Sequence, residues 1–264
     1  MAAEKRVSES ARPGSVNVCA QGPFVMHRME NAPLIAKEWN QVAWGNFETN
    51  LEFLRRVGFG AGHLTLLEIG CGKGALLSRL RAMGHRVWGI DTDIEAIAFC
   101  KANHPEVGAC AGLGEKLPFR DHVFDTVLSF DVFEHIADSD QHLREVRRVL
   151  KPAGAYLLQT PNKWTNIPFD VLRHHRKLGI GLVASYHSLL EDHCALHNYW
   201  ELRRRFERHG FELTFVNVPV VNDYFRAKMR EYLGALGPAL LRVLNPDRFP
   251  MCMRTNFYAR GVLR

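Results

Sequence analysis

Apolar and polar positions follow a regular order through the middle of the chain. Short apolar runs predict buried strands at 63–70, 86–91, 107–112, 124–130 and 155–160. Amphipathic spacing between these runs predicts helices at 75–84, 94–104 and 138–150. Strands that alternate with helices in this way predict a parallel sheet with helices on both faces.

The rhythm changes after Pro161. Residues 161–196 contain no clear strand and are rich in histidine and aromatic residues. Beyond them, the pattern predicts a helix at 198–210, a strand at 211–218, an amphipathic helical stretch at 222–244 and a last strand at 256–263. We therefore expect a tail and cap helices over 1–62, including aromatic-rich helical residues 34–57. One domain over 63–264 follows, with cover inserts at 161–196 and 219–255.

Composition narrows the class of protein. The 264 residues are 47% hydrophobic and 23% charged, which excludes a disordered or fibrous chain. The net charge of +6 is spread over several segments, so we expect no nucleic-acid partner. The six cysteines form no C-x-x-C pair, which favours free thiols in a reducing cytoplasm. No apolar run approaches 18 residues, so we expect no stable membrane insertion.

A glycine-rich loop and a distant acid carry the first chemical signal. The strand at 63–70 leads into Gly70, Gly72 and Gly74, and a helix follows. Asp91 comes 21 residues after Gly70, at the end of the next strand. Bare backbone at a helix N-terminus, with a carboxylate beside it, suits a nucleotide and its ribose hydroxyls. A dinucleotide cofactor and a glycine turn without ligand both remain open on this motif alone.

Six segments in order identify a family resemblance. They are LLEIGCGKG (66–74), VWGIDTD (87–93), GEKLPF (114–119), FDTVLSFDVFEHI (124–136), LREVRRVLKPAGAYLLQTPN (143–162) and HNYWELRRRFERHGFE (197–212). This series resembles the class I S-adenosylmethionine-dependent methyltransferases. It is similar to the small-molecule type that includes the ubiquinone- and menaquinone-biosynthesis enzymes. The resemblance implies a Rossmann-like α/β fold with a seven-stranded, mostly parallel sheet whose last strand is antiparallel.

The resemblance also implies a set of cofactor-binding residues. They are Glu68, Gly70, Cys71, Gly72, Gly74, Asp91, Thr92, Asp93, Leu113, Gly114, Phe130 and Asp131. Asp91 would hold the ribose of S-adenosylmethionine, and Asp93 is also a plausible helix N-cap. Leu113 stands where the family often has an acid that binds the adenine amino group, so here the adenine would be held by backbone groups and packing.

Histidines and aromatic residues are the candidates for the reaction itself. A methyl acceptor can need a base with a pKa near neutrality, and we expect His135 or His197 in that role. For His135 the alternative is a capping or packing role. The predicted substrate-binding residues are Trp39, Trp44, Trp164, His193, Tyr199 and Tyr224. His193 and His197 could share a helix face and bind a metal with Asp192, but we expect no metal.

We therefore expect transfer of a methyl group to a small molecule, to an oxygen of an apolar or aromatic metabolite. Methylation at nitrogen or carbon of a lipid, quinone-like or natural-product substrate is one alternative. A non-catalytic binding subunit with the same fold is another. The 222–244 segment is left open as a pocket lid, a homodimer face or a membrane contact.

Overall fold

The structure is a computed structural model that describes residues 46–167 and 193–264. Seven strands form one sheet: β1 (Thr65–Ile69), β2 (Arg86–Asp91), β3 (Gly108–Ala111), β4 (Phe124–Phe130), β5 (Leu150–Pro161), β6 (Phe211–Phe215) and β7 (Asn256–Leu263). The helices are α1 (Asn46–Arg56), α2 (Ala75–Ala82), α3 (Ile94–Asn103), α4 (Ser139–Val149), α7 (Tyr199–Arg208), α8 (Asp223–Leu233) and α9 (Leu236–Val243). Short 3₁₀ turns are η2 (Phe133–His135), η3 (Pro246–Arg248) and η4 (Met251–Met253).

The sheet has the strand order β3-β2-β1-β4-β5-β7-β6. The first five strands run parallel, and β7 pairs antiparallel with both β5 and β6. Ile69 pairs with Ile90 on one side and with Ser129 on the other. The loops after β1, β2 and β4 therefore leave the same edge of the sheet side by side, at the point where the strand order reverses. Open α/β sheets bind their ligands at this point.

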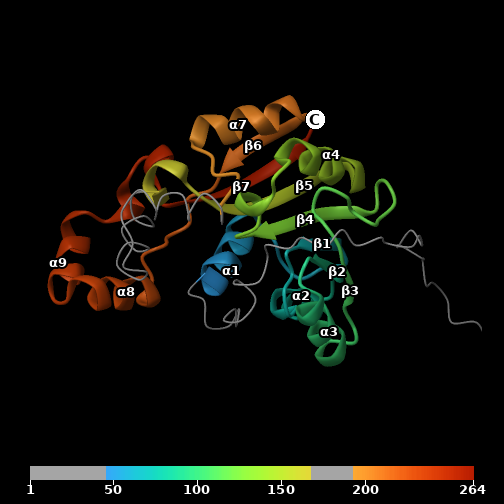
Figure 1. The fold of residues 1–264 in the computed structure, drawn as a ribbon, viewed down its shortest axis with the longest axis horizontal. Coiled ribbons are helices and arrows are strands. Elements are labelled where there is room, and N and C mark those ends of the chain that lie inside the picture. The colour runs from blue at the N-terminus through green and yellow to red at the C-terminus, as the bar shows by residue number, and fades with distance from the viewer. Residues whose placement is uncertain (1–45, 168–192) are drawn as a thin grey trace, which may run out of the picture.

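Alternating side chains divide the core between the two faces of the sheet. Leu67, Val127 and Leu158 pack with α4 and α7, whereas their neighbours Leu66, Leu128 and Leu157 pack with α1, α2 and α3. Figure 1 shows these helix groups above and below the sheet. Because both faces are covered, the strands read as nearly continuous apolar runs, which is the pattern seen in the sequence.

The seven-stranded sheet with an antiparallel last strand confirms the predicted fold class. Two details differ. The predicted strand 155–160 extends back to Leu150, through Pro152 and Gly154, because the chain stays paired beside a register shift in β4. The 222–244 segment is two helices, because Gly234 takes a φ of 59° between α8 and α9.

Some predictions concern residues that the structure does not describe. Residues 34–45 and most of the 161–196 insert lie outside them. In the part of the chain that is described, no helix combines the length and the apolar character needed to cross a membrane. The helices α8 and α9 lie at one end of the molecule in Figure 1, and Leu236 and Val243 of α9 are exposed. Their role as lid, dimer face or membrane contact stays a prediction.

Candidate active site

The glycine loop turns sharply between β1 and α2. Gly70, Gly72 and Gly74 have φ values of 75°, 49° and 83°, in the left-handed region that glycine adopts most easily. The amides of Gly70 and Cys71 both donate to the carbonyl of Ile90, at 2.8 and 3.2 Å, which fixes the loop to the end of β2. A Cβ atom at Gly70 would overlap the Val132 side chain. The loop therefore presents bare backbone to the crevice.

Asp91 ends β2 beside the glycine loop and is already hydrogen-bonded to it. Its Oδ2 accepts from the Gly72 amide at 2.7 Å and its Oδ1 from the Asp93 amide at 2.9 Å. A carboxylate has about four lone-pair sites, so roughly two remain for other donors such as a ribose diol. Burial raises the pKa of Asp91, and hydrogen bonds from the backbone amides of Asp93, Gly72 and Thr92 oppose that shift. Asp93 accepts from the Glu95 and Ala96 amides and caps α3, as predicted.

Glu68 places a second carboxyl beside the same loop. Its side chain is buried, and its Oε2 has no hydrogen-bond partner among the described residues. Burial, and after it the charge of Asp91, raise the pKa of Glu68 well above its usual value. Burial and the neighbouring negative charge both disfavour the ionised form of Glu68. A nearby positive charge would stabilise that form, so this pair of carboxyls favours a cationic ligand.

The loop after β3 forms another side of the crevice. The Gly112 amide donates to the Asp91 carbonyl at 2.9 Å, which joins this loop to the ribose acid. Leu113 is 38% exposed, so its side chain is accessible from the solvent. The Gly114 carbonyl accepts from His142 Nδ1 at 2.9 Å. Thr92, next to Asp91, is exposed, whereas the Cys71 side chain is fully buried and can face a ligand through its backbone alone.

A polar cluster lies where β4 and β5 end. Asp131 has a φ of 54°, its amide donates to Gln159 Oε1 at 2.8 Å, and its Oδ2 accepts from Asn46 at 3.0 Å. Burial raises the pKa of Asp131. Phe130, the preceding residue, packs edge-on against Phe53 of α1. Helix α1 therefore contacts the end of β4 through both a polar and an aromatic side chain.

His135 lies on η2 between two other titratable groups. The neighbouring Glu134 is buried, accepts from Thr160 at 3.0 Å, and has a pKa raised well above its usual value by burial and by Asp131. The His135 and His193 rings are 4.9 Å apart. Potential metal-ligand atoms of Glu134, His135 and His193 all lie within 4.8 Å of one another. The absence of a metal therefore stays a prediction.

The interpretation of His193 and His197 as neighbours on one helix face is wrong. Residues 193–198 form a turn and a bridge, and α7 begins at Tyr199, so the two histidines face different surroundings. His197 is 6% exposed, lies 5.4 Å from the Phe133 ring, and has a pKa lowered to about 4, chiefly by burial. This environment favours packing over proton transfer. Its catalytic role stays a prediction.

The lowered pKa of His197 predicts that the free energy of unfolding depends on pH. Its folded pKa of about 4 lies below the unfolded value of 6.5, so unfolding takes up a proton between these values. The stabilisation is present above pH 6.5 and is lost as the pH falls toward 4. We expect the free-energy difference of unfolding between wild type and His197→Phe to shift by about 2 kcal/mol between pH 7 and pH 5. Urea titrations at both pH values measure it, and an unchanged difference would contradict the assignment.

The predicted substrate-binding residues do not form one cluster in the described part of the structure. Tyr199 stacks on Phe215 with ring centroids 4.3 Å apart, at the start of α7. Trp164 is half exposed and lies 5.2 Å from the Trp200 ring. Trp39 and Trp44 lie outside the described residues, and of Tyr224 the structure gives the position on α8 alone. Of the predicted substrate-binding residues, His193 has its ring beside that of His135.

Several polar residues of this site were missed in the sequence. Gln159 and Thr160 end an otherwise apolar strand, and Tyr258 is buried beside them in β7. Gln159 Nε2 and the Tyr258 hydroxyl have no hydrogen-bond partner among the described residues. Polar residues at the carboxyl end of an apolar strand were the available signal, since those ends line the crevice.

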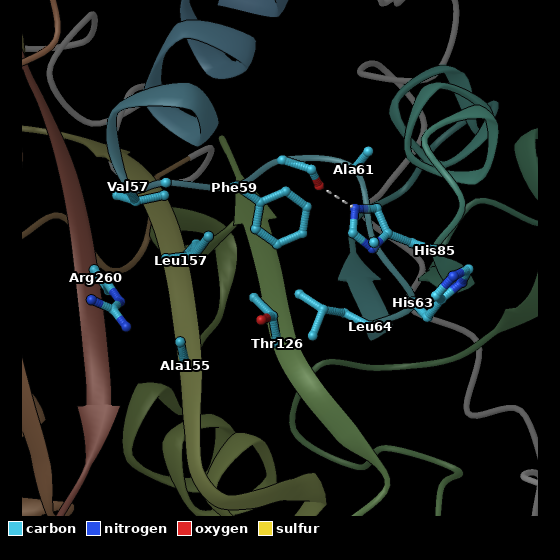
Figure 2. Close-up of a pocket in the computed structure, with 13 residues that line it drawn as sticks. Val57, Phe59, Ala61, His63, Leu64, His85, Thr126, Ala155, Leu157 and Arg260 are labelled. Carbon is cyan, nitrogen blue, oxygen red and sulfur yellow. Dashed lines mark hydrogen bonds between the residues drawn. The ribbon is translucent and has the colours of Figure 1, made fainter.

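A separate cavity of about 390 Å³ lies at the opposite edge of the sheet. Figure 2 shows Phe59 and His85 side by side over Leu64, Thr126 and Leu157, with the bond from His85 to Gly60 drawn. Thr126 and Leu64 lie near the amino ends of β4 and β1. The cavity is therefore distant from the glycine loop and is not part of the crevice.

Comparisons with known proteins agree with this geometry. Residues 67–158 match the family model described as a methyltransferase domain. A Mycolicibacterium smegmatis protein named "Probable S-adenosylmethionine-dependent methyltransferase/" is 38% identical over 103 residues, 39% of this chain and 40% of that protein. A Nitrobacter winogradskyi ubiquinone biosynthesis O-methyltransferase is 29% identical over 199 residues, 72% of this chain and 70% of that one. The match thus spans about 40% of the length of the first curated relatives.

Solved structures share the fold. A Haloferax volcanii methyltransferase, solved in complex with the Trm112 methyltransferase activator, has a TM-score of 0.62 and 21% identity, over 83% of this chain and 90% of its own. Phosphoethanolamine N-methyltransferase 2 of Haemonchus contortus, solved with S-adenosyl-L-methionine, has a TM-score of 0.56 and 18% identity, over 83% of this chain and 52% of its own. At this level of identity the likeness establishes the fold.

Proposed function

We propose that this chain, whose residues 67–158 match the family model described as a methyltransferase domain, transfers a methyl group from S-adenosylmethionine to a small molecule. The observation that carries the proposal is the joining of Glu68, the glycine loop and Asp91 at one edge of the sheet. A dinucleotide would use the same loop. The domain match and the buried Glu68 carboxyl, whose Oε2 has no hydrogen-bond partner among the described residues, favour a donor that carries positive charge.

The residues of the crevice fit this donor. Asp91 would hold the ribose, the Leu113–Gly114 loop the adenine, and Glu68 with the glycine loop the amino-acid end. When bound, S-adenosylmethionine supplies an activated methyl group on a positively charged sulfonium. The side chains at the ends of β4 and β5 then have two tasks, which are to orient the acceptor and to exclude water from it.

Oxygen is the acceptor atom that the proposal favours, because a hydroxyl acceptor loses a proton and His135, just after the carboxyl end of β4, is a candidate to take it. Its ring is half-buried, close enough to ionised Asp131 to stabilise that charge, and beside the His193 ring. The similarity to a ubiquinone biosynthesis O-methyltransferase supports the same atom. Apolar and aromatic acceptors suit the surroundings, since the partly exposed ring of Phe130 lies at the carboxyl end of β4 beside Asp131.

Replacement of His135 is expected to slow methyl transfer without affecting donor binding. General bases contribute about 10²- to 10⁴-fold, so His135→Ala should lower kcat by about 100-fold or more with saturating acceptor. The affinity for S-adenosylhomocysteine should change by less than about threefold, because the base acts on the acceptor. His63→Ala, an exposed histidine at the opposite edge of the sheet, is the matched control. Full turnover in His135→Ala would exclude His135 as the general base.

The proposed function is tested by binding first and by turnover second. Calorimetry with S-adenosylhomocysteine and with NAD separates the two cofactor classes, and we expect heat with the former alone. Transfer of a labelled methyl group to a panel of phenols, hydroxyquinones, amines and RNA then identifies the acceptor. Binding without transfer to any of them would favour a non-catalytic binding subunit. Binding of NAD in place of S-adenosylhomocysteine would overturn the proposal.

A further inference from the structure

Three buried polar side chains form a line through the core beneath the crevice. His142 of α4, Tyr156 of β5 and Ser129 of β4 are each 0% exposed. His142 Nε2 lies 2.8 Å from the Tyr156 hydroxyl, and that hydroxyl lies 2.7 Å from Ser129 Oγ. On its other side, His142 Nδ1 lies 2.9 Å from the Gly114 carbonyl oxygen. Buried polar groups of this kind specify one arrangement when every member is bonded.

The chemistry of the groups fixes the direction of these bonds. A carbonyl oxygen accepts and never donates, so His142 Nδ1 carries the proton and donates to Gly114. Burial lowers the pKa of His142 to about 4, so the ring is neutral near pH 7 and Nε2 is an acceptor. Tyr156 therefore donates to His142, and Ser129 donates to Tyr156. The chain of donors runs from the sheet to the Gly114 carbonyl.

The end of this chain lies on the crevice loop. Gly112, two residues earlier, is bonded to the carbonyl of Asp91. A Cβ atom at Gly114 would lie 3.0 Å from His142 Nδ1 and 3.1 Å from Ile136 Cδ1, so the loop backbone is in close contact with the ring. Other α4 side chains hold the loop further along, since Gln141 donates to the Glu115 carbonyl and Glu145 accepts from the Leu117 amide.

The same imidazole also contacts the opposite end of the crevice. Its ring centroid lies 5.7 Å from that of Phe133 in an edge-on arrangement. Phe133 is fully buried and begins the η2 turn that carries Glu134 and His135. One side chain thus packs against both the loop assigned to the adenine and the turn assigned to the acceptor.

We propose that His142 is a positioning residue that holds the 112–116 loop in its binding conformation through the Gly114 carbonyl. The role in donor binding rests on the proposed function, whereas the role in loop order does not. The structural alternative is that His142 simply fills the core. The two ring nitrogens have separate partners, so substitutions that keep one bond at a time distinguish the two roles.

His142→Asn and His142→Gln form a matched pair of substitutions, because each keeps one of the two hydrogen bonds of the ring. An asparagine amide nitrogen overlays Nδ1 and can still donate to Gly114, whereas a glutamine amide overlays Nε2 and keeps the Tyr156 side of the chain. Both remove one buried bond, so their thermal unfolding midpoints are expected to fall by similar amounts. The rates of hydrogen exchange at the Gly114, Glu115 and Lys116 amides, measured by NMR in the absence of ligand, report how well the loop is ordered. The Leu117 amide, which is bonded to Glu145, is the internal reference.

We expect His142→Gln to speed exchange of the loop amides at least tenfold and to weaken S-adenosylhomocysteine binding at least tenfold. His142→Asn should restore both to within about threefold of wild type, and Leu117 exchange should be the same in both variants. Equal exchange and equal affinity in the two variants would overturn the positioning role. Failure of the wild-type protein to bind S-adenosylhomocysteine would count against the proposed function, and the exchange comparison would still decide whether His142 holds the loop.

Discussion

Replacement of Asp91 by alanine is expected to weaken S-adenosylhomocysteine binding at least tenfold. The carboxylate accepts two backbone amides, from Gly72 and Asp93, and has lone pairs left for ribose hydroxyls. Hydrogen bonds to a charged group contribute about 1.5–3 kcal/mol each, so loss of the ribose contacts alone accounts for a tenfold change. Loss of the Gly72 bond would also remove one of the hydrogen bonds that hold the glycine loop, beside those of Gly70 and Cys71 to Ile90. Calorimetric titration measures the affinity directly.

Asp91→Asn is the control that separates charge from shape. An asparagine oxygen can still accept one of the two amide bonds, so we expect its unfolding free energy to stay closer to that of wild type than that of Asp91→Ala. Its affinity for S-adenosylhomocysteine should nevertheless fall, because an amide cannot accept from both ribose hydroxyls. Equal affinity in wild type and Asp91→Ala would refute the ribose assignment.

Substitution of Gly70 by alanine is expected to be the most damaging change in the glycine loop. A non-glycine residue at a φ of 75° costs about 1–2 kcal/mol, and the new Cβ would overlap Val132. Relief of such an overlap typically adds about 1–3 kcal/mol. We therefore expect a loss of about 2–5 kcal/mol in the free energy of unfolding, together with at least a tenfold loss of S-adenosylhomocysteine affinity.

Gly58 supplies a closely matched control. Its φ of 77° is nearly the same as that of Gly70, but a Cβ there would have no atom within 4 Å. Gly58→Ala should therefore show the backbone cost alone, about 1–2 kcal/mol in urea unfolding, with unchanged S-adenosylhomocysteine affinity. If both variants lose the same stability and retain the same affinity, then close packing at Gly70 does not shape the site.

The order of elements was predictable because each segment carries a strong local period. The runs at 86–91 and 124–130 match β2 and β4 residue for residue, since each is a short segment rich in apolar residues that is bounded by turn or polar residues. The glycine loop and Asp91 were predictable because the turn conformation and the ribose acid need particular residue types. Asp93 was predictable as an N-cap for the same reason.

The contacts that complete the site depend on pairing between distant segments. Asn46 reaches Asp131 across 85 residues, and His193 meets His135 from the far side of an insert. A spacing of four residues suggested a shared helix face for His193 and His197, but the helix starts two residues later, where Asn198 forms a capping box with Glu201. The buried His142 did interrupt the apolar face of its helix, which was a visible signal of a polar partner in the core.

The position of β7 has a consequence for how the molecule is made. β7 is inserted between β5 and β6, and it provides the strand pairing of β6 within the described sheet. During synthesis, the segment that forms α7 and β6 leaves the ribosome before its neighbour in the sheet exists. Its apolar residues Phe206 and Phe211 must wait for residues 256–263 before they can be fully covered. The nascent chain would therefore expose this edge until residues 256–263 have also left the ribosome, and during that interval this edge is a place where a chaperone would bind.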